Sequence, residues 1–191
     1  IDHFNVQKLS TEALKEIRIK YRWQAIDREN EAIEKAKKNK KRFEPAVLVN
    51  GDTVKQLLAR SRYFLYKNKS KWTANQLQRA LLLFELYPDI KEAYNLSQGL
   101  RNIFENTTDK IIGFARLAKW HEKVNQSGFK SFNTISRTII NHYQNILNYF
   151  DNRSTNASAE SFNAKIKAFR SQFRGVRNIE FFLFRLTNIY A

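Results

Sequence analysis

The chain has 191 residues, with 34 Lys and Arg against 18 Asp and Glu, so its formal net charge is +16. It contains no Cys and no Met, only five Gly and two Pro, and 42% of its residues are hydrophobic. This composition excludes a disordered basic tail, a disulfide framework and a thiolate metal site. No run of about 18 apolar residues is present, so no membrane span is expected.

The positive charge is spread over all four quarters of the chain rather than confined to a tail. A charge of this size on a folded chain favours phosphate backbones or anionic surfaces as partners. The alternative is a generally basic surface with no particular partner. The opening residues, IDHFNVQKLS, lack the apolar segment of a signal peptide. Because no initiator Met is present, we expect the sequence to be a piece of a longer protein.

Scarce Gly and Pro together with 3.6-residue periodicity predict helix nearly everywhere. A short strand is expected only within Ile1–Leu9 and, as one of two readings, within Arg62–Tyr66. Capping residues and breakers place the helix boundaries. Helices are therefore predicted from Ser10 or Thr11 to about Arg42, from Asp52 or Thr53 to Tyr66, from Thr73 to Tyr87, from Asp89 to Glu105, from Asp109 to Gly128, from Ser131 to Phe150, from Asn156 to Phe173 and from Asn178 to Tyr190.

The predicted helix near the C-terminus carries the most informative pattern. Phe162, Ile166 and Phe169 fall on one face at 100° per residue. The opposite face holds one acid among polar and basic residues: Glu160, Asn163, Lys167, Arg170 and Arg174. A lone carboxylate in a first helical turn ordinarily stabilises the helix dipole. The functional alternative is a ligand for a hard divalent cation, with the neighbouring cations holding a phosphodiester.

Asp2 is the second candidate acid. The segment Ile1–Val6 is typical of a strand end that carries an acid, although an exposed terminal Asp fits equally well. The three histidines lack the i,i+4 spacing of a helical metal site, and His121 and His142 are expected in the core. The tryptophans, Trp23, Trp72 and Trp120, are also expected in the core rather than stacked on bases. Phosphate-binding glycine loops and a serine-hydrolase elbow are absent.

Two blocks of sequence resemble a known family. The stretch STNASAESFNAKIKAFRSQFRGVRNIEFFLFRL is similar to the C-terminal signature of bacterial insertion-sequence DDE transposases of the ISL-three group. The matching positions are Thr155, Asn156, Glu160, Asn163, Lys165, Ile166, Lys167, Arg170, Gly175, Asn178, Phe182 and Arg185. The opening block resembles the family's D-x-F-H-V-x-K-L pattern at Asp2, Phe4, Val6, Lys8 and Leu9. Asn5 stands where the family usually has His, so no role is carried over to that position.

The resemblance implies a ribonuclease-H-like core in which three carboxylates bind two Mg²⁺ or Mn²⁺ ions. Asp2 would be the second carboxylate and Glu160 the third, and the first would precede Ile1. The implied fold is mainly α: a helical bundle or insertion domain flanked by partial elements of an α/β catalytic core. Residues 1–9 would be the end of a core strand, 10–150 the helical region with its inserted domain, and 151–191 the core helices carrying the third acid. Asn163, Lys165, Lys167, Arg170 and Arg174 would contact DNA.

The expected function is metal-dependent cleavage and transfer of DNA strands during transposition of an insertion sequence. The expected partners are transposon ends, target DNA and a second copy of the chain, with no membrane or nucleotide cofactor and a bacterial cytoplasmic, nucleoid-associated location. Without the first acid the fragment is expected to be inactive alone. The alternatives are a non-catalytic helical DNA-binding or regulatory module and a basic scaffold for a protein partner. The transposase hypothesis requires Asp2 and Glu160 to lie within several ångströms.

Overall fold

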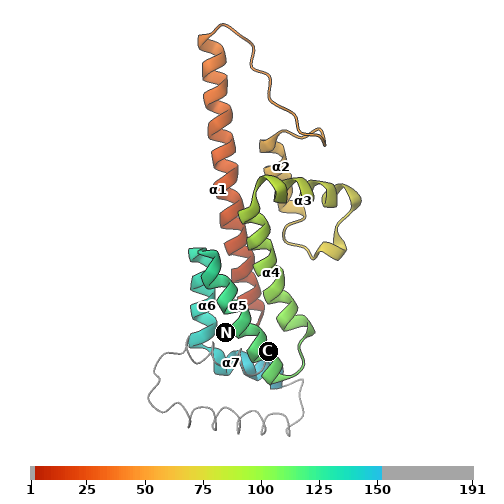
Figure 1. Ribbon diagram of the computed structural model, residues 1–191, viewed down its shortest axis with the longest axis vertical. Coiled ribbons are helices and arrows are strands. Elements are labelled where there is room, and N and C mark those ends of the chain that lie inside the picture. The colour runs from red at the N-terminus through yellow and green to blue at the C-terminus, as the bar shows by residue number, and fades with distance from the viewer. Residues whose placement is uncertain (1–2, 152–191) are drawn as a thin grey trace. The chain divides into compact units, whose positions relative to one another are not determined.

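The computed structural model describes the backbone of residues 3–151, and within this range the chain is mainly helical (Figure 1). The described part contains no strand apart from an isolated bridge between Val47 and Thr53. The elements are α1 (His3–Lys38), α2 (Val54–Arg60), the 3₁₀ turns η1 (Ser61–Tyr63) and η2 (Lys69–Lys71), α3 (Ala74–Leu86), α4 (Pro88–Asn106), α5 (Lys110–Ser127), α6 (Lys130–Asn141) and α7 (Tyr143–Asp151).

The chain forms two compact units. Among the described residues, one comprises Thr11–Asn95, and the other joins His3–Ser10 with Leu96–Asp151. The two units are defined by contacts between residues. The predicted catalytic-core and inserted segments were assigned on a different basis and stay predictions. None of the helices within residues 3–151 is long and apolar enough to cross a membrane.

The Thr11–Asn95 unit is built on the long helix α1 and the shorter helices α2 and α3. Its buried residues include Leu14, Ile17, Leu57, Leu58, Phe64, Leu65, Leu83 and Ile90. Arg18 is also buried, at 5% exposure, and donates to the Leu58 carbonyl (3.1 Å) and to the Tyr66 hydroxyl (3.2 Å). Since Leu58 lies in the last turn of α2, the Arg18 guanidinium also meets the negative end of that helix dipole.

The other unit packs α5 against α6 and α7. Its buried residues include Phe104, Phe114, Trp120, Val124, Phe132, Ile139, Leu147 and Phe150. The Trp120 indole donates to the Leu96 carbonyl (2.8 Å), so the largest side chain of α5 has its polar atom satisfied. Gly113 allows the Phe150 ring of α7 to approach, because a Cβ there would lie 2.9 Å from two ring carbons.

Several predicted helix ends are confirmed. Thr53 and Thr73 each form a capping box, with Gln56 and Gln76 respectively. Asp109 caps α5 through the Ile112 amide, and Gly128 ends α5 in the left-handed conformation (φ 71°). Pro88 ends α3 as expected, but it is also the first residue of α4, where its missing N–H costs nothing.

Several expectations about elements are wrong, beginning with those for the first residues and for Arg62–Tyr66. His3–Leu9 is helical rather than extended, because Val6 and Ser10 are buried one turn apart below Leu14 and continue its apolar face. Ser10 therefore does not cap a helix; its hydroxyl donates to Ser97 (2.8 Å). Arg62–Tyr66 comprises the end of η1 and the turn after it, so it is neither a strand nor a continuation of α2, which ends at Arg60.

The predicted Ser131–Phe150 helix is two helices, since α6 ends at the capping residue His142 and α7 begins at Tyr143. His142 is consequently exposed rather than in the core. Trp23 is 60% exposed and also contradicts the expected core position, whereas Trp120 and His121 are buried as expected.

Candidate functional site

The acids and DNA-binding residues predicted from the sequence lie outside the described residues. These are Asp2, Glu160, Asn163, Lys165, Lys167, Arg170 and Arg174. The distance between the Asp2 and Glu160 carboxylates would distinguish a catalytic transposase domain from a non-catalytic DNA-binding module. This distance lies outside the described residues. Among the residues that the structure does describe, no group of three or more His, Cys, Asp or Glu side chains is placed to hold a metal ion.

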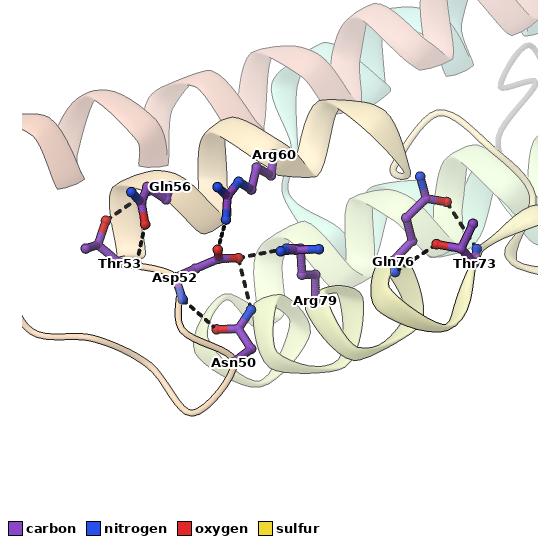
Figure 2. A network of polar contacts seen from close by, with 8 residues as sticks. All are labelled: Asn50, Asp52, Thr53, Gln56, Arg60, Thr73, Gln76 and Arg79. Carbon is purple, nitrogen blue, oxygen red and sulfur yellow. Dashed lines mark hydrogen bonds and ion pairs between the residues drawn. The ribbon is translucent and has the colours of Figure 1, made fainter.

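The most elaborate polar arrangement in the described chain centres on the Asp52 carboxylate (Figure 2). Its side chain is 1% exposed and forms ion pairs with Arg60 of α2 and with Arg79 Nε of α3, the latter at 2.7 Å. The Asn50 amide donates a third hydrogen bond (3.0 Å). A buried carboxylate needs such partners, since an unpaired one would carry a large desolvation cost. Asp52, which lies just before α2, therefore links the last residue of α2 to the middle of α3.

A tight turn presents Asp52 to the two arginines. The Gly51 amide donates to the Leu48 carbonyl and the Leu48 amide to the Asp52 carbonyl, both at 2.8 Å. Gly51 has φ +81°, a left-handed conformation that glycine adopts without strain. The Asn50 side-chain oxygen accepts from the Asp52 amide (3.2 Å). The predicted turn at Asn50-Gly51-Asp52 is thus confirmed, and Asp52 serves as an ion-pair partner while Thr53 is the cap.

After this turn, a segment of irregular backbone connects α2 to α3. The Trp72 indole donates to the Phe64 carbonyl (2.8 Å), and the Tyr94 hydroxyl donates to the Lys67 carbonyl (3.1 Å). Asn68 caps η2 by accepting from the Ser70 amide (3.0 Å). The segment displays exposed cations at Arg62, Lys67, Lys69 and Lys71.

His121 has the contacts of a structural residue. It is 7% exposed, its Nδ1 meets the Ser136 hydroxyl, and its Nε2 lies 3.0 Å from the Asn125 amide nitrogen. Ser136 is 1% exposed, so a substrate has no access to its hydroxyl. Ser136, His121 and Asn125 are arranged like a nucleophile, a base and an orienting group. Because Ser136 is buried, we assign this trio a structural role and not a catalytic one.

Comparison with known families decides what kind of protein this is. The model of a transposase family, the DDE transposases of the ISL-three group, matches residues 1–186. The chain belongs to this transposase family. Neither a curated protein nor a solved structure matches it. The family resemblance inferred from the two terminal sequence blocks is confirmed, and the match extends across the helical region between them.

Membership in the family implies action on DNA, and DDE transposases as a class use divalent metal ions. The feature of this transposase to which sequence reasoning assigned no function is the exposed basic segment after α2, where Lys67–Lys71 is predicted to be a basic loop. A simple signal marks it, since no Asp or Glu occurs between Asp52 and Glu85. The spacing of hydrophobic residues does not reveal it, because the segment is neither helix nor strand over most of its length.

Proposed function

We propose that this chain supplies part of the catalytic domain of a transposase that cleaves DNA strands and joins them to a target. One observation carries the proposal: the family match over residues 1–186 includes both candidate acids, Asp2 and Glu160, in a single alignment. The mainly helical character of residues 3–151 is compatible with the long helical region expected between these acids.

The chemistry of the two candidate ligands fits a hard divalent cation. Asp2 and Glu160 offer carboxylate oxygens, which Mg²⁺ and Mn²⁺ prefer over nitrogen or sulfur. Bound ions would activate water or a 3′-hydroxyl for in-line attack at phosphorus and stabilise the leaving oxygen. The first of the three carboxylates that the family resemblance implies is proposed to precede Ile1 in the protein sequence, and a site without it would not cleave DNA.

The predicted helix after Thr155 would position the DNA strand. The side chains of Asn163, Lys165, Lys167, Arg170 and Arg174 would hold phosphates next to the metal ligands. Arginine matches phosphate geometry with two parallel hydrogen bonds, whereas lysine acts as a point charge. Pairing of two transposon ends makes a homodimer the expected assembly.

The proposal is tested by Glu160→Gln in the full-length protein, which keeps the side-chain size and removes the negative charge. Loss of a group that only orients a ligand costs about 10–100-fold in activity or affinity, so loss of a direct ligand should cost more. We expect metal-dependent cleavage of DNA carrying the element's ends to fall by more than about a hundredfold, with DNA affinity retained. Cleavage is read on end-labelled duplex, and affinity by fluorescence anisotropy.

Glu180→Gln is the matched control, because it removes the same charge from the same region at a residue with no predicted metal role. It should leave cleavage at the wild-type rate. Full activity of the Glu160 variant would overturn the metal-ligand assignment. A full-length wild-type protein that binds DNA but cleaves it with neither Mg²⁺ nor Mn²⁺ would support the non-catalytic DNA-binding module instead.

A further inference from the structure

The stretch Thr53–Phe84 is unusually unbalanced in charge. It contains seven cations and no Asp or Glu. The cations are Lys55, Arg60, Arg62, Lys67, Lys69, Lys71 and Arg79. All of them belong to the Thr11–Asn95 unit and precede the predicted DNA-binding residues 163–174 by more than 80 positions in the sequence. The imbalance therefore marks a second basic region.

Ion pairs neutralise three of the seven cations. Lys55 pairs with Glu29 (2.5 Å), and Asp52 pairs with both Arg60 and Arg79. The other four have no carboxylate partner within residues 3–151, and all four are exposed. These four, Arg62, Lys67, Lys69 and Lys71, are here called the basic platform. Four exposed cations without a carboxylate partner among the described residues thus lie between the end of α2 and the start of α3.

The backbone that carries the basic platform is anchored. Phe64 and Leu65, in the turn after η1, are both buried, and the Trp72 ring packs edge-on against Phe64 (5.7 Å between centroids). The indole and Tyr94 hydrogen bonds fix the Phe64 and Lys67 carbonyls. The Lys71 amide donates to the Asn68 carbonyl (2.9 Å). Only the side chains need to be ordered when an anion binds, which lowers the entropic cost of binding.

Arg62 is held differently from the three lysines. Its guanidinium lies 4.6 Å from the centroid of the Tyr63 ring and also donates a hydrogen bond to the Tyr63 hydroxyl. Tyr63 is 54% exposed, so this stacked pair lies at the surface beside the lysines. A stacked guanidinium keeps its charge and retains N–H groups for an oxygen acceptor.

The basic run at the end of α1 provides a useful comparison. Residues 35–42 contain six cations, but Glu31, Glu34 and Glu44 lie close to them in sequence. Lys37 pairs with Glu34 (3.0 Å), one turn away. Cations in the last turn of a helix are also explained by the helix dipole. The helical part of this run, Lys35–Lys38, therefore has a structural explanation, and the platform, which is in no α-helix, has none.

We propose that the basic platform binds the phosphate backbone of duplex DNA without reading its sequence. The choice of DNA rests on the proposed function, while the location rests on the unpaired charges and the anchored backbone. Lysine ammonium groups suit this contact because they act as point charges that tolerate different phosphate positions. Such a contact would add to the one proposed for residues 163–174, because it is made by a different part of the sequence.

The test is the salt dependence of DNA affinity, measured with the full-length protein and a duplex of arbitrary sequence. Each phosphate contact adds about 0.9 to the magnitude of the slope of log K against log salt concentration. Replacing Lys67, Lys69 and Lys71 together by Gln should lower that magnitude by up to about 3, and Lys69→Gln alone by up to about 1. Circular dichroism checks that the fold is retained, as expected for exposed positions.

The matched control replaces Lys38, Lys40 and Lys41 by Gln, which removes the same charge from exposed residues of the same unit. The proposal requires a clearly smaller change in slope for this control. Equal changes for both triple variants would show a bulk charge effect and overturn it. An unchanged slope for the Lys67 triple variant would overturn it as well, and so would loss of affinity for RNA duplex but not for DNA.

The outcome is separable from that of the proposed function. Reduced salt dependence in a protein that never cleaves DNA would support the platform and contradict the catalytic proposal. Cleavage that depends on Glu160, in a protein whose platform variants bind DNA like the wild type, would do the reverse.

Discussion

Asp52 shows how one buried residue organises an exposed basic region. Its carboxylate accepts from two arginines and one amide while being 1% exposed. The arginine side chains are only partly covered, at 47% and 26% exposure, so water also reaches them. Removing the carboxylate charge would leave two neighbouring guanidinium groups facing each other without compensation. Asp52 is therefore expected to matter more for stability than a surface ion pair does.

We predict that Asp52→Asn lowers the free energy of unfolding by about 2–4 kcal/mol. Breaking a buried pair typically costs about 3–5 kcal/mol, and partial hydration of the two arginines reduces that cost. The new amide also directs N–H groups toward donors. The measurement is urea unfolding followed by circular dichroism, with wild type and variant compared at the same salt concentration.

Glu29→Gln is the comparison for this prediction, because it removes a carboxylate that pairs with a single, 42% exposed Lys55 side chain. Exposed pairs contribute about 0–1 kcal/mol, so its effect should be small. A cost for Asp52→Asn no larger than that for Glu29→Gln would show that the buried network does not hold α2 to α3.

Two glycines inside helices, Gly99 of α4 and Gly113 of α5, lie close to aromatic rings but leave different amounts of space for a side chain. A Cβ on Gly113 would lie 2.9 Å from the Phe150 ring, which is fully buried and stacked on Phe104 with an interplanar angle of 7°. A Cβ on Gly99 would lie 3.7 Å from Trp120, an ordinary contact distance. The same substitution should therefore have opposite effects at the two sites.

We predict that Gly113→Ala destabilises the protein and Gly99→Ala stabilises it. Helix propensity favours Ala by up to about 1 kcal/mol at either position. At Gly113 this gain is outweighed by overpacking, which typically costs about 1–3 kcal/mol, because the Phe150 ring that the new methyl group meets is fully buried and stacked on Phe104. Thermal unfolding midpoints of the two variants test this. Stabilisation by Gly113→Ala would mean that α7 shifts away from α5 at little cost.

At the scale of the whole molecule, local signals located helix ends but not tertiary partners. Thr53, Thr73, Asp109 and Gly128 were predictable because caps and left-handed glycines act within one turn of the helix. The break at His142 was not, since no Gly or Pro marks it and the apolar spacing continues on both sides. The exposure of Trp23 likewise depends on which helices pack nearby, which a periodicity cannot show.

The candidate sites also depend on information that local sequence signals do not contain. The acids Asp2 and Glu160 could be proposed only through the family resemblance, because a lone carboxylate has no distinctive local pattern; their roles stay predictions. The pairing of Asp52 with Arg79, 27 residues away in sequence, follows from the packing of α2 on α3. The basic platform is defined by such ion pairs, because they show which cations of the Thr53–Phe84 stretch are already neutralised.

Salt has two opposing effects on the stability of a folded chain with a net charge of +16. Salt weakens repulsion among the many cations, which stabilises the folded chain, and it also weakens attractive ion pairs. Residues 3–151 contain five ion pairs, most with at least one well-exposed partner, and such pairs contribute little. The Asp52 carboxylate is buried, so its pairs are screened least. Relief of repulsion should therefore dominate.

We predict that adding NaCl at neutral pH raises the midpoint of thermal unfolding in the absence of DNA. Screening worth about 1 kcal/mol would raise the midpoint by about 2–4 °C for a chain of this length. The variant with Gln at positions 38, 40 and 41 starts with three fewer positive charges, so its midpoint at low salt should be higher and its response to salt weaker. Chloride is the salt to use, because sulfate stabilises proteins by exclusion whatever their charge. A midpoint that falls with salt would mean that attraction between paired charges outweighs the excess of cations, and that the positive charge costs the folded chain little.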